Sequence, residues 1–389
     1  MHGMALANPG QTRARIRPVA AYLIVLLVAG LITYAATPIT LSFSKRIGAV
    51  DVPNDRKVHA VPTPTLGGTA MFVGFLGAML LASAIDPFRD SFRPALVWPA
   101  SELIAIVIGT AIIFVLGVVD DVKGLKAPVK LSGQLLAAGF VFLSGVRLEY
   151  FRFPLRGVGA LSMSPDVSAL ATIAWIVIIV NAVNLMDGLD GLAAGVTAIA
   201  AATFFVYTYQ LSRQGLVGPE PTAALVSAAV VGVTLGFLKY NFNPAKIFMG
   251  DSGSMTLGFL LATSTVAGVG RSATQSPSEI SAAFIFYLPL VVPLIVLAIP
   301  ILDTTLAVVR RARKGTPVFN ADKEHLHHRL LDLGHGHRQA VLIMYVWTAL
   351  IAGMTLALTF RPIYVVPFVA AAFGMVLYTA LPGLGKRSL

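Results

Sequence analysis

The sequence predicts an all-α, polytopic integral membrane protein, and three observations lead to that fold class. Hydrophobic residues make up 56% of the chain and charged residues only 12%, whereas about a quarter of an average soluble domain is charged. The mean hydropathy is +0.80. The apolar runs extend without alternation over about 17–25 residues, the length with which a helix crosses the hydrocarbon core, whereas the strands of a membrane barrel would alternate.

Eleven such runs follow one another along the chain, and we predict a transmembrane helix for each. The first is longer than the apolar region of a typical signal peptide and lacks a convincing cleavage site, so we interpret it as a helix. Short polar segments separate the later runs, and no tandem repeat interrupts them. The predicted spans are 19–41, 68–85, 101–119, 131–146, 169–186, 192–211, 221–238, 254–270, 283–302, 339–359 and 363–382.

The distribution of Lys and Arg predicts the orientation. An odd number of spans places the two termini on opposite sides of the membrane. With the N-terminus outside and the C-terminus cytoplasmic, the cytoplasmic segments hold 18 Lys and Arg residues and the outer segments hold 11, as the positive-inside rule requires. We therefore expect the net charge of +11 to reflect basic loops near the anionic cytoplasmic leaflet rather than nucleic-acid binding.

This topology predicts one transmembrane domain at 19–382, between an N-terminal tail at 1–18 and a cytoplasmic tail at 383–389. Because the chain has no Cys, a disulfide framework and a thiolate metal site are excluded. Nearly every carboxylate or His suited to chemistry falls on the cytoplasmic side, so we expect one face to carry the active site. The loops on that side are 42–67, 120–130, 187–191, 239–253 and 303–338.

The segment GVVDDVKGL sets Asp120 and Asp121 at the end of the third span, before a loop with three Lys residues. Adjacent acids can simply mark a membrane boundary. Ammonium groups beside carboxylates, however, suit a site that holds a metal and phosphates. If the next helix begins near Pro128, Lys130 and Gln134 share one face at i, i+4 spacing and point at one ligand.

The segment NAVNLMDGLDGL lies at the end of the fifth span. In it, Asn181, Asn184, Asp187 and Asp190 recur every three residues, a spacing that forms one polar stripe along a helix. Buried polar groups are costly unless they are paired or bound to a cation. The stripe either forms hydrogen bonds between helices or is a ligand site. The Gly residues beside the acids favour the ligand site.

The segment KIFMGDSGSMTLG places Asp251 between two Gly residues, just before the eighth span. Alone, it is compatible with a plain turn. Beside two other acidic segments on the same face, it is a candidate ligand of a hard cation, and an all-oxygen ligand set points to Mg²⁺ or Mn²⁺ rather than Zn²⁺. Phe248, a residue type more often found in a core, would stack on a base if it lies at the pocket mouth.

Two basic segments complete the set. HLHHR supplies His325, His327, His328 and Arg329. Zinc is the rival interpretation, but His pairs on zinc helices are usually spaced i, i+4 with a further ligand, so donors for phosphate or sugar hydroxyls fit better. NDRKVHAVPTPTLGG carries Lys57 in a Pro-stiffened loop that suits a lipid phosphate at the interface, although an ordinary positive-inside loop has the same composition.

In their order along the chain, the five segments resemble those of the polyprenyl-phosphate N-acetylhexosamine-1-phosphate transferases, glycosyltransferase family 4. The likeness covers about residues 45 to 338, and HLHH after RRARKG is similar to the WecA branch, whereas the MraY branch has three consecutive His. The resemblance implies that a polyprenyl phosphate, undecaprenyl or decaprenyl, attacks the β-phosphorus of UDP-N-acetylglucosamine and releases UMP. The lipid-linked sugar diphosphate would be the first membrane intermediate of a cell-envelope polysaccharide.

The resemblance also implies a role for each matching residue. Asp251 and Asn184 would hold Mg²⁺ or Mn²⁺. Asp120 or Asp121 would deprotonate or orient the lipid phosphate, and Asp187 would either support the metal or act as nucleophile. Lys57, Lys123 and Lys130 would bind the lipid phosphate, and the UDP-sugar would lie among Asn181, Asp190, Asn241, Phe248, His325, His327, His328 and Arg329.

Alternatives remain at this point. A secondary transporter would explain acids in apolar helices, but its site would lie near the midplane between inverted repeats, and these acids lie at span ends on one side. A scaffold for envelope assembly would need none of the acids. Within the enzyme interpretation, another UDP-N-acetylhexosamine is the alternative donor, and both direct attack and a covalent phospho-enzyme are open. Related enzymes suggest a homodimer.

Overall fold

The computed structural model describes residues 18–53, 61–92, 101–152, 160–214, 222–269, 336–360 and 362–380. Ten of the eleven predicted spans coincide with helices there, and the ninth, 283–302, lies outside the described residues. Two short 3-10 helices also occur, η1 (Arg89–Phe92) and η2 (Pro362–Tyr364). The α-helices are α1 (Pro18–Ile47), α2 (Gly67–Ala84), α3 (Glu102–Lys123), α4 (Ala127–Leu143), α5 (Pro165–Met186), α6 (Leu192–Arg213), α7 (Thr222–Asn241), α8 (Gly250–Val269), α12 (His337–Phe360) and α13 (Val365–Ala380).

Seven of the described helices are long and apolar enough to cross a membrane, namely α1, α2, α3, α5, α6, α7 and α12. Helix α4 and the first part of α13 are shorter apolar helices. The prediction of an all-α polytopic membrane protein is therefore confirmed. The number of eleven spans and the sides of the two termini stay predictions.

Local chemistry explains where the helices begin. Helix α5 starts at Pro165, four residues before the predicted boundary, because the Ser164 hydroxyl accepts the N–H of Val167 at 3.4 Å and Pro fits a first helical turn. Helix α4 starts at Ala127 with Pro in its first turn. Only residues 124–126 therefore separate α3 from α4, and most of the predicted loop 120–130 is helical.

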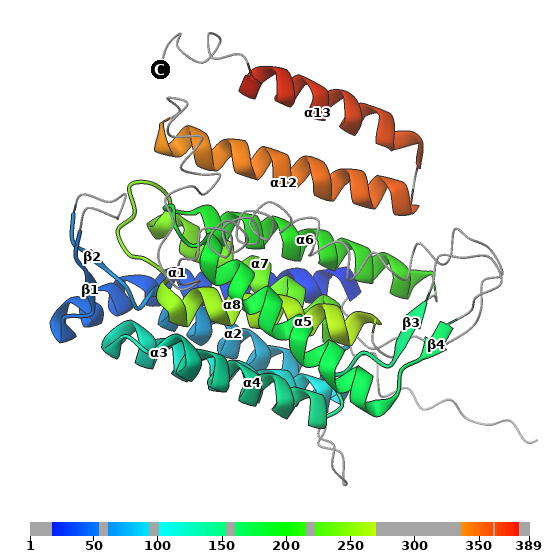
Figure 1. The fold of residues 1–389 in the computed structure, drawn as a ribbon, viewed down its shortest axis with the longest axis horizontal. Helices are drawn as coiled ribbons and strands as arrows, with labels where there is room; N and C mark the ends of the chain where they lie inside the picture. Colours follow the sequence, from blue (N-terminus) through cyan, green and yellow to red (C-terminus); the bar gives the residue numbers. More distant parts are fainter. Residues whose placement is uncertain are drawn as a thin grey trace, which may run out of the picture.

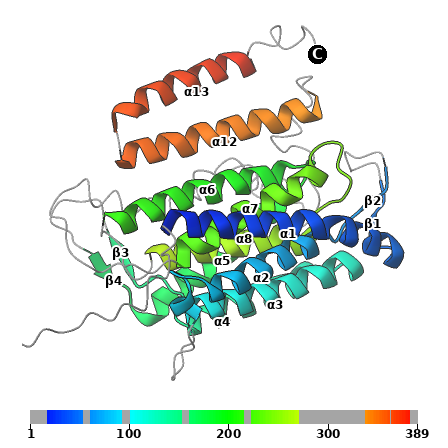
Figure 2. The ribbon, with the colours of Figure 1, turned by 180° about the vertical axis from the view of Figure 1, so that it is seen from behind.

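Helix α8 is the central helix of the bundle. It packs against α2, α3, α5 and α7, and every residue from Ser252 to Val266 is buried. Figures 1 and 2 show α12 and α13 stacked on the side of α6, with α3 and α4 on the opposite side of the bundle. The N-terminus of α8, which carries Asp251, is thus enclosed by neighbouring helices.

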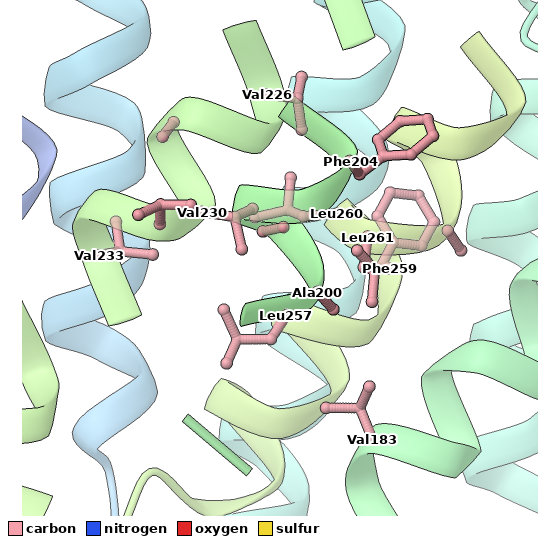
Figure 3. Close-up of a cluster of buried hydrophobic side chains, with 14 of the residues drawn as sticks. Val183, Ala200, Phe204, Val226, Val230, Val233, Leu257, Phe259, Leu260 and Leu261 are labelled. Carbon is pink, nitrogen blue, oxygen red and sulfur yellow. The ribbon is translucent and has the colours of Figure 1, made fainter. Parts of the chain in front are cut away.

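The apolar core surrounds α8, as Figure 3 shows. Phe259 and Leu260 of α8 lie there among side chains of three other helices, including Val183 of α5, Phe204 of α6 and Val230 of α7. Because lipid tails are as apolar as these side chains, close packing rather than water exclusion stabilises such contacts in a membrane. The core fixes α8 relative to the helices whose ends carry the polar residues.

Two glycines allow the first turn of α8 to approach its neighbours at backbone distance. A Cβ atom on Gly68 of α2 would lie 2.2 Å from the Gly253 nitrogen, and one on Gly117 of α3 would lie 2.4 Å from the Ser252 Cα. Side chains at either position would push α8 away. The backbone N–H of Gly68 also donates to the Met249 carbonyl at 2.8 Å, so α2 is fastened to the residue before this turn.

Two short hairpins add to the helices: β1 (Val50–Asp51) pairs with β2 (Thr63–Pro64), and β3 (Tyr150–Arg152) pairs with β4 (Ala160–Ser162), both antiparallel. Strands of two or three residues are too short to show an alternating pattern, so the sequence did not predict them. Since α1 continues to Ile47, the predicted loop 42–67 is partly helix and partly hairpin.

Candidate active site

The described parts of the predicted cytoplasmic loops gather at one end of the bundle. The N–H of Phe248 donates to the Pro64 carbonyl at 2.8 Å, which joins the loop before α8 to the hairpin before α2. The N–H of Asp251 donates to the Asp121 carboxylate at 2.7 Å, which joins α8 to α3. These segments therefore lie together at one end of the bundle, while the active site and its cytoplasmic side stay predictions.

Two carboxylates share one ammonium group at the centre of this end. Lys130 of α4 lies with its Nζ 2.7 Å from Asp120 Oδ2 and also contacts Asp251 Oδ2. All three side chains are partly buried. Burial weakens screening by water, so removal of the ammonium would leave two carboxylates repelling each other. Lys130 therefore holds α3, α4 and α8 together through charge.

Asn184 of α5 completes this group. Its amide nitrogen donates to Asp251 Oδ1 at 3.0 Å and to the Ser254 hydroxyl at 2.9 Å. Asp251 is consequently contacted by an amide on one oxygen and an ammonium on the other. We call Asp120, Lys130, Asn184 and Asp251 the acidic cluster. The sequence predicted each member, and the structure brings all four together.

Asp121 has a different environment from its neighbour Asp120. Its two oxygens accept the N–H groups of Asp251, at 2.7 Å, and of Ser252, at 3.1 Å, in the first turn of α8. A carboxylate at a helix N-terminus satisfies free N–H groups and complements the helix dipole. Asp121 thus caps α8, and the acidic pair divides into one residue that faces Lys130 and one that holds the helix of Asp251.

A polar layer lies one turn deeper. Asn181 donates to Gln134 Oε1 at 2.7 Å and to the Val177 carbonyl at 2.8 Å. Gln134 is 2% exposed, and its own amide nitrogen lies 3.5 Å from the Met255 sulfur. The prediction that Lys130 and Gln134 share a face of α4 is confirmed. The Asn181 amide nitrogen thus bonds to a side chain of α4 and to the backbone of its own helix. Its predicted place near the uridine stays a prediction.

Asp187 follows α5 directly and is partly buried. Burial raises the pKa of its carboxyl well above the ordinary value, and the negative charges of neighbouring carboxylates, Asp251 foremost, raise it further. Within the described part of the chain, no donor contacts this carboxylate. A carboxyl in a site with surplus negative charge is suited to bind a cation or to take up a proton.

Asp190 and Asn241 join the turn after α5 to the loop before α8. Asp190 Oδ2 accepts from the Asn243 amide at 2.8 Å and from the Ala245 N–H at 3.0 Å. Asn241 is 2% exposed, accepts the Gly191 N–H at 3.1 Å and donates to the Ile247 carbonyl at 3.1 Å. Both ends of the Asn241 amide are thereby used within the fold, so the structure gives it an architectural role.

The remaining predicted residues are spread more widely. Phe248 is partly buried, and its carbonyl accepts the Gly67 N–H at 3.0 Å. Lys123 is exposed at the end of α3, three residues after Asp120. The predicted residues Lys57, His325, His327, His328 and Arg329 lie outside the described residues.

Sequence reasoning assigned no role to several polar residues at this end, among them Ser254, Asn243 and Tyr345. Ser254 lies three residues after Asp251, and that helical spacing is a signal that would have linked the two. Asn243 stands two residues from Asn241, but a single amide in a loop carries no distinctive pattern. Tyr345 contacts residues far away in the sequence, so no local pattern reveals it.

The donor set is suited to hard cations and phosphates. Carboxylates and an amide provide oxygen ligands, and Lys130 provides a phosphate-binding ammonium. Among the described residues, no three His, Asp or Glu side chains form a closed metal cage. Mg²⁺ is commonly bound by one or two carboxylates together with substrate phosphates and water, so an open arrangement fits it.

Comparison with known proteins identifies a matching family and several similar proteins. A model of the family described as glycosyl transferase family 4 matches residues 103–269, the part that contains the acidic cluster. The chain is 40% identical over 339 residues to the decaprenyl-phosphate N-acetylglucosaminephosphotransferase of Mycobacterium tuberculosis. The aligned region covers 86% of this chain and 82% of that protein.

Two further relatives extend this similarity. A Bacillus subtilis protein described as a probable undecaprenyl-phosphate N-acetylglucosaminyl 1-phosphate transferase is 35% identical over 334 residues, or 85% of this chain and 82% of that one. The phospho-N-acetylmuramoyl-pentapeptide-transferase of Desulforudis audaxviator is 30% identical over 352 residues, or 85% and 94%. The similarity therefore extends over most of the chain, well beyond the family model.

Proposed function

The chain belongs to glycosyl transferase family 4, and we propose that its donor is UDP-N-acetylglucosamine and that the acidic cluster is its reaction centre. It is a phosphoglycosyltransferase that transfers N-acetylglucosamine 1-phosphate to a membrane polyprenyl phosphate. With this donor, the β-phosphorus bonds to the lipid phosphate oxygen and UMP leaves. The observation that carries the proposed centre is the shared contact of Lys130 with Asp120 and Asp251 at the polar end of the bundle.

The position of this cluster suits a reaction between a lipid and a water-soluble nucleotide. Asp120 lies near the end of a long apolar helix, and Asp251 lies at the start of the central one. A lipid phosphate at the membrane surface and a donor from the cytosol can meet only at such an end. The excess of Lys and Arg in the loops on this side supports a cytoplasmic site, with the N-terminus outside. The bacterial relatives support placing the protein in a bacterial cytoplasmic membrane.

Asp251 and Asn184 are the residues that would hold a divalent cation, Mg²⁺ or Mn²⁺. Their contact at 3.0 Å puts a carboxylate and an amide at one point, and the surplus of carboxylates over Lys130 leaves negative charge for a cation to offset. When bound, the ion would neutralise charge on the diphosphate and on the leaving UMP.

The chain's own groups provide the other parts of the reaction. Lys130 can move its contact from a carboxylate to a phosphate oxygen, which would offset the repulsion between two anionic substrates. Asp120, released from Lys130, would accept a proton from the lipid phosphate or orient it. Asp187 would either support the cation or attack in a two-step route. Lys57 and Lys123 are proposed to attract the lipid phosphate.

The proposed nucleotide side lies next to the acidic cluster. Asp190, which keeps a second carboxylate oxygen beyond the one that Asn243 and Ala245 contact, is proposed to accept an N–H of the base. Phe248 is proposed to stack on it. The His and Arg residues of the HLHHR segment are proposed to donate to the diphosphate and the sugar, as their sequence pattern suggests.

A donor panel tests this function. Purified protein would receive undecaprenyl or decaprenyl phosphate, Mg²⁺ and one labelled UDP-sugar, and both UMP and chloroform-soluble label would be measured. We expect product from UDP-N-acetylglucosamine, and loss of product with a chelator that excess Mg²⁺ reverses. Product from another UDP-N-acetylhexosamine alone would refute the donor assignment, and no product from any donor would refute the function.

A further inference from the structure

Three side chains at the start of α12 hold the backbone of the two loops beside the acidic cluster. His337 Nε2 accepts the N–H of Asp190 at 3.1 Å. The Tyr345 hydroxyl donates to the Gly191 carbonyl, and Arg338 Nε donates to the Asn243 carbonyl at 2.9 Å. We call His337, Arg338 and Tyr345 the clasp. The reaction proposed above gives none of them a role.

Tyr345 fastens the clasp to the scaffold. A Cβ atom on Gly195 of α6 would lie 2.0 Å from the Tyr345 ring, so the ring rests directly on the α6 backbone. Tyr345 follows His337 by eight residues, a spacing that keeps both on one stripe of α12. Helix α12 packs against α6, and Tyr345 lies in that contact. The position of α6 therefore determines where His337 meets the Asp190 turn.

The loops that the clasp holds are also bonded to each other. Asp190 Oδ2 binds Asn243 and Ala245, and Gly191 binds Asn241. With the clasp, both the N–H and one carboxylate oxygen of Asp190 are committed to the fold. Its other carboxylate oxygen is therefore presented from a turn with little freedom to rotate, a common way to preorganise a binding residue.

We propose that the clasp is a positioning device for the donor nucleotide: His337 and Tyr345 hold the turn 187–191 so that Asp190 meets the base, without touching the reacting atoms themselves. The inference rests on the proposed function. It assigns α12 to donor binding rather than acceptor binding, because the clasp contacts Asp190, Gly191 and Asn243 but none of Asp120, Lys130 or Asp251.

The His337 bond has a specific atomic requirement. Nε2 accepts a hydrogen bond and must be unprotonated, so the neutral ring carries its proton on Nδ1. A Gln side chain places its carbonyl oxygen where Nε2 lies, whereas an Asn side chain reaches only as far as Nδ1. Comparison of His337→Gln with His337→Asn therefore distinguishes loss of the hydrogen-bond acceptor from a general change of the site.

The test measures the KM of each substrate separately with purified full-length protein. We expect His337→Ala and His337→Asn to raise the KM for UDP-N-acetylglucosamine about tenfold, the effect of one hydrogen bond, with the KM for polyprenyl phosphate unchanged. His337→Gln should restore the donor KM to within about twofold. Tyr345→Phe, which keeps the ring on Gly195, should raise the donor KM less. Leu342→Ala, which changes a side chain of α12 that is 49% exposed, is the matched control.

Two results would overturn the proposal. Equal changes in both KM values, or lower thermal stability in the His337 variants with an unchanged donor KM, would make the clasp purely structural. If the donor KM of His337→Gln is as high as that of His337→Asn, Nε2 does not act as the hydrogen-bond acceptor. If the wild-type protein makes no lipid product with any donor, the proposed function fails instead, so the two failures are distinguishable.

Discussion

The acidic cluster and the clasp lie at the same end of the bundle but use their polar atoms differently. In the acidic cluster, Lys130 and Asn184 bind the side chains of Asp120 and Asp251. In the clasp, His337 and its neighbours bind backbone atoms of the loops. Side chains that bind one another can exchange partners for a ligand, whereas those that bind backbone hold the chain in place. Reaction and positioning are thus divided between two regions.

The largest effect is expected from Asp251→Asn. The change keeps the size of the side chain but removes the charge that would hold the cation, so turnover should fall by at least about 10³-fold. Thermal stability should stay close to that of the wild type. Initial rates and a melting curve on the same preparation measure both. A variant with a clearly lower melting temperature but normal turnover would instead place Asp251 with the positioning residues.

Lys130→Met should reduce kcat by about 10²–10³-fold. It also leaves Asp120 and Asp251 without the ammonium that they share, so the protein should be less stable at neutral pH than at acidic pH, where the carboxylates take up protons. Lys130→Arg keeps the charge and serves as the control. A Met variant with normal kcat would show that Lys130 has only a structural role.

The neighbours Asp120 and Asp121 provide a matched pair. Asp121→Ala leaves two N–H groups of α8 without a cap and should lower the free energy of unfolding by about 1–2 kcal/mol. Asp120→Ala should lower turnover strongly with a smaller change in stability, because its carboxylate faces Lys130. Denaturation curves and rates for both variants test the distinction. A large loss of stability for Asp120→Ala and a large loss of turnover for Asp121→Ala would contradict these assignments.

The smallest effect concerns Asp187, whose folded-state pKa is raised. Between the unfolded value of about 3.9 and the raised folded value, the folded state binds more protons, so stability falls as pH rises through that window. Asp187→Asn removes this loss. In the presence of a chelator, the variant should melt slightly above the wild type at pH 7 and equally below about pH 4. A difference that is the same at both pH values would contradict the assignment.

The sequence predicted the acidic cluster because its members recur in short motifs at the ends of apolar runs. Lys130 and Gln134 followed from helical spacing, and Asp251 from its place beside two other acidic segments on the same predicted face. The separate tasks of Asp120 and Asp121 were not predictable, since adjacent residues of a helix point about 100° apart and only the packing of α3 on α8 decides which one faces Lys130.

The clasp shows why the rest escaped prediction. His337 meets Asp190 across 147 residues of sequence, and Tyr345 meets Gly191 across 154. No local pattern encodes such contacts, and a His in LGHGHR is compatible with an ordinary turn. The hairpin β1–β2 escaped for a related reason, because two residues per strand carry no periodicity.

The glycines beside the first turn of α8 have a consequence for engineering. One added carbon on Gly68 or Gly117 would collide with the backbone of α8, which cannot rotate out of the way as a side chain can. Mutational scans of this enzyme should therefore find sensitive positions among residues that never meet a substrate. Changes meant to widen substrate range should therefore avoid these two positions.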